Sequence, residues 1–135
     1  MNDEERYTQG IQVRTEVLGE KHVGRSLENL NDFNDDFQNF ISRFAWGEVW
    51  SRPGMPRHTR SLVTIAILLA LGRNDELRMH IRTCLNNGVT KDNLKELFLH
   101  SSLYAGLPAA NAAMHMAEEI FEEMGIAPKK IVEDQ

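Results

Sequence analysis

FNDDFQNFISRFAWGEVWSRPG, residues 33–54, carries the clearest structural signal in this chain. Its apolar side chains recur at spacings of three and four, as on one face of a helix, at positions Phe33, Phe37, Phe40, Ile41, Phe44 and Ala45. The spacing predicts a helix that runs towards Trp50. Arg52-Pro53-Gly54 ends it, because proline restricts the residue before it and glycine leaves the backbone free.

Helical signals recur along the rest of the chain, whereas no alternating β-branched run and no Asn-Gly hairpin turn between such runs indicates a strand. Residues 26–33 are ambiguous and fit a short helix followed by a turn. Further helices, several bounded by capping residues, are expected over about residues 5–18, 56–71, 74–87, 90–104 and 108–124. The short loops between the later helices indicate a compact all-α bundle of about six helices.

We expect one domain over residues 1–126 and a frayed tail over residues 127–135. Residues 61–71 are apolar on nearly all sides, so protein must surround that helix. In a domain of this size, such a helix indicates a subunit interface as well as a core, and therefore an oligomer.

The composition excludes several classes of protein. A chain of 135 residues that is 41% apolar and 26% charged is typical of a soluble globular domain. Its formal net charge of -5 opposes nucleic-acid binding, and the single cysteine, Cys84, excludes an intrachain disulfide or a CxxC pair. The longest apolar run, residues 62–71, is about half as long as a membrane-spanning helix. With a polar, acidic start and no signal peptide expected, we predict a cytoplasmic protein.

Glu76 and His80 are one helical turn apart. The carboxylate can hydrogen-bond one imidazole nitrogen and leave the other for a ligand. The alternative is a surface pair with a small helical benefit. Cys84 follows one turn later and, as a lone cysteine within a helix, is expected to be a buried apolar residue.

Two further pairs stand just before the Pro-Gly break. Glu48 and Arg52 form either a surface ion pair worth ~0.3–0.5 kcal/mol or a site in which the guanidinium binds a substrate carboxylate. Trp46 and Trp50 either pack in the core or form an apolar wall of the substrate site. Together with the carboxylate–imidazole pair, these side chains outline a cofactor-free acid–base site for a small anionic substrate.

Other polar side chains are less specific. Arg57 and Arg60 oppose the helix dipole at the start of their helix, so they are either solvated or matched by an anion. Tyr104 precedes a run of small residues and serves packing or lines a cavity. The remaining histidines are His22, His58, His100 and His115. Their spacing matches no metal-binding motif, so we expect none of them to be a metal ligand.

Two strings carry a specific resemblance: Trp-Gly-x-x-Trp-x-Arg-Pro-Gly over residues 46–54 and Tyr-x-Gly-x-Pro-Ala-Ala-Asn over residues 104–111. With them, nearly the whole chain except the tail resembles the carboxymuconolactone decarboxylase family. Further matching segments are Val13-Arg14, Val17-Leu18-Gly19, Arg60-Ser61-Leu62, Ala70-Leu71-Gly72-Arg73, Glu76-Leu77, His80-Ile81-Arg82, Asn87-Gly88, Thr90 and Glu96.

The resemblance implies an all-helical, alkylhydroperoxidase D-like fold and a homohexamer built as a trimer of dimers. Peroxidase relatives carry a CxxC pair ahead of a histidine. Arg73 and Glu76 stand at the thiol positions of this chain, and His80 stands at the histidine. Thiol redox chemistry is therefore lost, while the acid–base groups remain.

The implied reaction is the decarboxylation of 4-carboxymuconolactone to 3-oxoadipate enol-lactone and CO2 in protocatechuate catabolism. The substrate is a butenolide with a ring carboxylate and an acetate arm. Its ring and lactone carbonyl accept the electrons left by CO2, so no cofactor or metal is expected.

The resemblance also suggests roles for the candidate residues. His80 donates the proton or stabilises the oxyanion, with Glu76 orienting it, while Glu48 positions Arg52 or itself handles the proton. The expected substrate-binding residues are Arg52, Trp46, Trp50, Arg57 and Tyr104.

Three alternatives stay open at this point. The chain is a relative acting on another small carboxylated lactone, or a peroxidase-like stress protein without the CxxC thiols. The third alternative is a helical oligomer that only binds a ligand or partner through the Trp46 and Trp50 surface.

Overall fold

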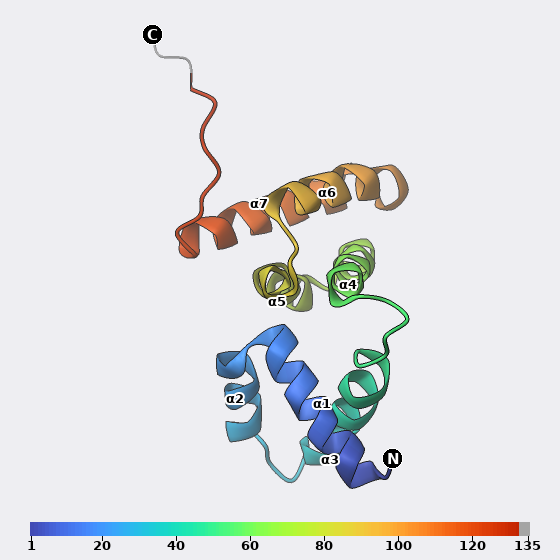
Figure 1. Ribbon diagram of the computed structural model, residues 1–135. Coiled ribbons are helices and arrows are strands. Elements are labelled where there is room, and N and C mark those ends of the chain that lie inside the picture. The colour runs from blue at the N-terminus through green and yellow to red at the C-terminus, as the bar shows by residue number, and fades with distance from the viewer. Residues whose placement is uncertain (133–135) are drawn as a thin grey trace. The chain divides into compact units, whose positions relative to one another are not determined.

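The computed structural model describes residues 1–132, and every regular element among them is helical (Figure 1). The order is α1 (Asp3–Leu18), α2 (Glu20–Glu28), α3 (Asp35–Phe40), the π-helix η1 (Ile41–Val49), α4 (Arg57–Leu71), α5 (Asn74–Thr83), the 3₁₀ turn η2 (Cys84–Asn87), α6 (Lys91–Ala105) and α7 (Leu107–Glu123). The predicted all-α class is confirmed. Within residues 1–132, no helix combines the length and the apolar character needed to cross a membrane.

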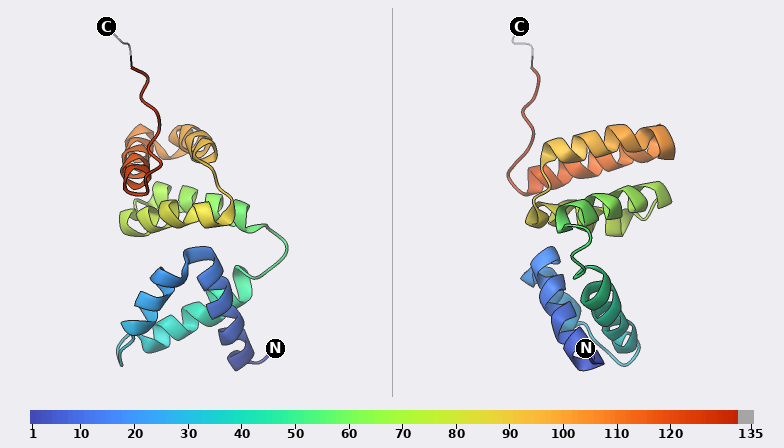
Figure 2. Two further views of the ribbon diagram at one scale, coloured as in Figure 1. Left: turned by 60° about the vertical axis from the view of Figure 1, so that its left-hand side comes forward. Right: turned by 45° about the vertical axis from the view of Figure 1, so that its right-hand side comes forward.

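The chain divides into two compact units. The first unit comprises residues 1–63 and 83–89, and in it α1 packs against α2, η1 and η2. The second comprises residues 64–82 and the chain from Thr90 onward, and in it α6 and α7 run side by side in opposite directions (Figure 2). Helix α4 begins in the first unit and ends in the second.

Several predicted helix ends are confirmed. Helix α1 ends at Leu18, and Pro108 lies in the first turn of α7. Thr90 caps α6: its Oγ1 accepts the backbone N–H of Asn93 at 3.0 Å, and the Asn93 side chain accepts the N–H of Thr90 at 3.0 Å. These reciprocal bonds satisfy donors that a helix start leaves unpaired.

The structure adds detail to other predictions. The described residues hold seven α-helices rather than about six, because residues 20–28 form a separate helix after Gly19. The helix expected over residues 74–87 is α-helical only to Thr83 and ends as a 3₁₀ turn. Residues 127–132 of the expected frayed tail lie outside any helix, and residues 133–135 lie outside the described part of the chain.

The segment expected to be one regular helix before Trp50 also differs. Phe33 lies before α3 and is 93% exposed, and from Ile41 the helix continues with π geometry. The N–H of Trp50 bonds the carbonyl of Ala45, five residues back, at 2.9 Å. The expected apolar face is therefore wrong, because a π-helix has more residues per turn than an α-helix. The buried residues of η1 are Ser42, Trp46 and Gly47, at spacings of four and five. The expected face residues Phe37, Phe40 and Phe44 are exposed.

The π-helix lies against α1 at two glycines. A Cβ added at Gly10 would overlap the carbonyl oxygen of Ser42, and one added at Gly47 would overlap the carbonyl oxygen of Arg6. Both positions therefore require glycine for the backbones to approach so closely.

We predict that Gly10→Ala lowers the free energy of unfolding by about 3 kcal/mol or more, because the added methyl group forces the two backbones apart. Urea denaturation followed by circular dichroism measures the change. Gly24→Ala in α2 is the matched control, since its Cβ would meet nothing within 4 Å. The control should gain roughly 0.5–1 kcal/mol. Equal stability of the two variants would contradict the proposed close approach.

Candidate active site

The candidate residues fall into two groups, and each is described by itself. The first unit holds Trp46, Glu48, Trp50, Arg52 and Arg57, and the second unit holds Glu76, His80 and Tyr104.

Glu48 lies between two guanidinium groups. Its Oε1 accepts a hydrogen bond from Arg52 Nη1 at 3.4 Å, which confirms the predicted pair, and its Oε2 is 4.0 Å from Arg6 Nε. Arg6 also donates from Nη1 to Asp3 Oδ1 at 2.9 Å. The side chains of Glu48 and Arg52 are 51% and 63% exposed, so the pair itself adds little to stability. Sequence reasoning missed Arg6, because no local spacing connects it with Glu48.

Polar contacts hold the backbone of this segment in place. The carbonyl of Gly47 accepts hydrogen bonds from Gln9 Nε2 at 3.2 Å and from Ser51 Oγ at 2.8 Å. Arg60 donates from Nη2 to the carbonyl of Arg52 at 3.2 Å. The end of η1 is thus tied to α1 on one side and to the start of α4 on the other. Arg60 therefore holds the backbone at Arg52 in place, a role that the sequence analysis did not predict.

Trp46 and Trp50 stack on one another, with ring centroids 4.8 Å apart and planes 28° apart. Trp46 is 5% exposed and belongs to the core, whereas Trp50 is half-buried. The packing interpretation therefore holds for Trp46. Trp50 keeps indole surface that a ligand can contact.

Arg57 is matched by an anion within the chain. Its Nη2 lies 3.0 Å from Glu16 Oε1 on α1, so the compensating anion predicted for the start of this helix is confirmed as Glu16. This ion pair joins α4 to α1 in the first unit.

In the second unit, α5 presents His80 as a buried side chain, 8% exposed, and Glu76 as an exposed one. Two ion pairs tie α5 to α7: Arg78 Nη1 lies 3.0 Å from Glu119 Oε2, and Arg82 pairs with Glu123. These pairs join residues far apart in the sequence, and no motif predicted them.

Tyr104 is 82% exposed near the end of α6, and its ring lies 5.4 Å from that of His100. In the first unit, Cys84 is fully buried, as predicted, and burial raises the pKa of its thiol to about 12. Among residues 1–132, no cluster of three or more His, Cys, Asp or Glu side chains is arranged to hold a metal ion.

Comparison with known families names the class of protein that has this helical fold and these residues. The chain belongs to the Carboxymuconolactone decarboxylase family, whose profile matches residues 35–119. It is 82% identical over 134 residues to 4-carboxymuconolactone decarboxylase of Acinetobacter baylyi, covering 99% of this chain and 100% of that protein.

Two further relatives extend the comparison. The chain is 37% identical over 118 residues to nitrosuccinic acid decarboxylase of Metarhizium robertsii, which covers 87% of this chain and 82% of that protein. It is 54% identical over 48 residues to a 4-carboxymuconolactone decarboxylase sequence of Pseudomonas putida, which covers 36% of this chain and 100% of that sequence.

The burial of Cys84 predicts a thiol that does not react in the folded protein. A pKa raised from 9.0 to about 12 lowers the thiolate fraction about a thousandfold near pH 8. We expect negligible reaction with 5,5′-dithiobis(2-nitrobenzoate) in native buffer and one thiol per chain in urea. Because the folded-state pKa is raised, this thiol favours folding below about pH 9 and loses that effect between about pH 9 and 12. Rapid labelling of the native protein would contradict the assignment.

Proposed function

We propose that this chain decarboxylates 4-carboxymuconolactone to 3-oxoadipate enol-lactone and CO2, without a cofactor, in the cytoplasmic breakdown of protocatechuate. The observation that carries the proposal is the 82% identity to the Acinetobacter baylyi enzyme across that protein's full length. The paired Glu48 and Arg52 beside stacked indoles fit a site for an anionic, flat substrate.

The reaction requires one bond to break and one proton to be placed. The bond between the γ-carbon and its carboxylate breaks and CO2 leaves. The bonding electrons move through the ring double bond onto the lactone carbonyl oxygen, and a proton is then delivered to the α-carbon. The enzyme must hold the dianion and stabilise the developing negative charge on the carbonyl oxygen.

Arg52 is proposed to bind a substrate carboxylate through its planar guanidinium. Glu48, which lies between Arg52 and Arg6, is proposed to position Arg52. The half-buried indole of Trp50, stacked on Trp46 in the core, is proposed to form an apolar wall that keeps water from the leaving carboxylate. Arg57 and Tyr104 complete the proposed binding set, with Arg57 exchanging its contact with Glu16 for one with the substrate.

His80 is proposed to donate the proton or to stabilise the oxyanion, with Glu76 orienting it. Its burial supports this role, because a hydrogen-bond donor acts more strongly on a developing charge where water is scarce. The contacts of Glu48 with two arginines favour His80 over Glu48 as the proton donor.

The relatives and Cys84 bear on the alternatives. A peroxidase needs an accessible, acidic thiol, and the pKa of Cys84 is raised by burial. The 37% identity to nitrosuccinic acid decarboxylase instead makes another small carboxylic acid the second candidate substrate.

We expect the purified protein to release CO2 and to remove the absorbance of freshly generated 4-carboxymuconolactone in buffer with EDTA and no nucleotide. His80→Ala should lower kcat by roughly 10²–10⁴-fold, the range for losing a general acid. Glu48→Gln should raise KM more than it lowers kcat if Glu48 positions Arg52. An unchanged rate in His80→Ala would remove His80 from the mechanism.

Two comparisons sharpen this experiment. Cys84→Ser should retain activity, since the thiol takes no part in the reaction. Nitrosuccinate serves as the competing substrate. A well-folded oligomer that turns over nitrosuccinate but not the lactone would replace the proposed substrate and keep the decarboxylase class.

We further propose that residues 1–126 act as one domain and assemble as a homohexamer, a trimer of dimers. Large apolar side chains recur every four residues on α4 and along α6 into the start of α7, and they are 42–75% exposed. They are Val63, Ile67 and Leu71 on α4, Leu99 and Leu103 on α6, and Leu107 on α7. Such stripes are typical of surfaces that associate. Native mass spectrometry should give six times the 15.4 kDa chain mass. Ile67→Glu with Leu103→Glu should yield smaller species, and a wild-type monomer would contradict the proposal.

A further inference from the structure

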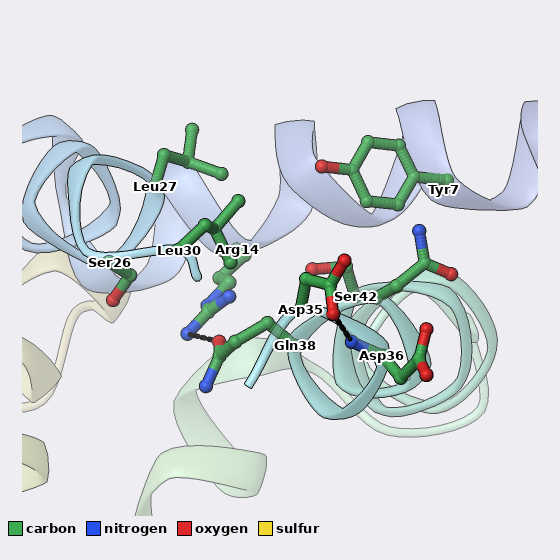
Figure 3. Close-up of a pocket in the computed structure, with 10 residues that line it drawn as sticks. Tyr7, Arg14, Ser26, Leu27, Leu30, Asp35, Asp36, Gln38 and Ser42 are labelled. Carbon is green, nitrogen blue, oxygen red and sulfur yellow. Dashed lines mark hydrogen bonds between the residues drawn. The ribbon is translucent and has the colours of Figure 1, made fainter. Parts of the chain in front are cut away.

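A separate pocket of about 170 Å³ lies within the first unit, and none of the residues proposed for catalysis lines it. Its walls come from α1, the end of α2, and the segment from α3 into η1 (Figure 3). By volume it has room for about five waters, at ~30 Å³ each, or for one small organic molecule.

Arg14 is the unusual feature of this pocket. The residue is 7% exposed, and Figure 3 shows its guanidinium extending from α1 towards Gln38. Nη2 donates to the Gln38 side-chain oxygen at 3.2 Å, whereas the buried Nε has no hydrogen-bond partner among the described residues. Burial lowers the pKa of Arg14 from its ordinary value, as expected where no anion offsets the lost hydration.

A buried guanidinium without an anion is costly, and native proteins normally pair such groups. The side chains around it include further hydrogen-bond donors: the hydroxyls of Tyr7, Ser26 and Ser42 line the same pocket. In Figure 3 the Tyr7 hydroxyl points along α1 towards Arg14. These groups suit a ligand that accepts several hydrogen bonds.

The rest of the lining limits which anion fits. Leu27 and Leu30 form an apolar side that is open to solvent, each being 40% exposed. Asp35 and Asp36 also line the pocket, and the Asp35 carboxylate is already engaged with the backbone N–H of Asp36 at 2.9 Å. Both carboxylates repel an anionic ligand, and this repulsion grows with the charge of the ligand, so a monoanion is opposed less than a dianion.

We propose that this pocket binds a small aliphatic monocarboxylate, with its carboxylate on the Arg14 Nε and its alkyl group against Leu27 and Leu30. The site is distinct from the proposed decarboxylation site, whose substrate is a dianion. Binding at the crossing of α1 with α3 and η1 stabilises the first unit, because the ligand neutralises a charge that folding buries.

The test is thermal unfolding of the full chain in sodium butyrate, disodium succinate or sodium chloride at equal ionic strength. Butyrate at ten times its dissociation constant should raise Tm by roughly 3–6 °C, while succinate and chloride should not. Arg14→Met, which removes the charge and keeps a similar apolar stem, should lose the butyrate effect. Arg25→Met is the matched control, since Arg25 does not line this pocket, and it should keep the effect.

A second measurement covers the case in which Arg14→Met does not fold. Wild-type protein with labelled leucine methyl groups should show nuclear Overhauser effects between butyrate and Leu27 or Leu30. Their absence, an equal Tm shift with chloride, or an undiminished butyrate shift in Arg14→Met would each overturn the proposal. In those cases the pocket holds only water, binds anions without regard to the alkyl group, or acts independently of Arg14.

Discussion

The contact on which the first unit depends is the close approach of α1 and η1 at Gly10 and Gly47. Without side chains there, the backbone of α1 lies directly against Ser42 and the end of η1. Gln9 can then donate to the carbonyl of Gly47, and Arg6 comes within 4.0 Å of Glu48. The crossing thus determines both the local backbone and the charge pattern that the proposed substrate site uses.

The sequence predicts those elements whose signals are local. The capping box at Thr90, the helix end at Leu18 and the first turn of α7 are each set by a few neighbouring residues. The π geometry of residues 41–49 is not predictable in this way, because it accompanies a tertiary contact with Gly10. Helix α2 was missed because it is short and holds only two large apolar side chains, Val23 and Leu27, of which only Val23 is buried.

The same difference between local signals and tertiary contacts applies to the candidate site. The pairing of Glu48 with Arg52 and the stacking of Trp46 on Trp50 follow from a four-residue spacing. Arg6, Gln9 and Glu16 reach their partners across long stretches of chain, and a single sequence holds no local signal for such contacts. The four-residue spacing therefore predicts the candidate site residues themselves. The residues that hold them in place come from tertiary contacts, which the sequence does not show.

Arg52 and Arg14 place opposite demands on a ligand. Arg52 has a carboxylate partner but is 63% exposed, and in water such a cation attracts a further carboxylate only weakly. Strong binding of a dianion at Arg52 therefore requires protein to cover the substrate, which fits the proposed oligomer better than an isolated chain. Arg14 has already lost its hydration on folding and lacks an anion at Nε, so a ligand there displaces little water from the cation and is opposed mainly by Asp35 and Asp36. Charge alone therefore does not show which arginine binds an anion more strongly. The extent to which each guanidinium is hydrated in the folded chain decides this.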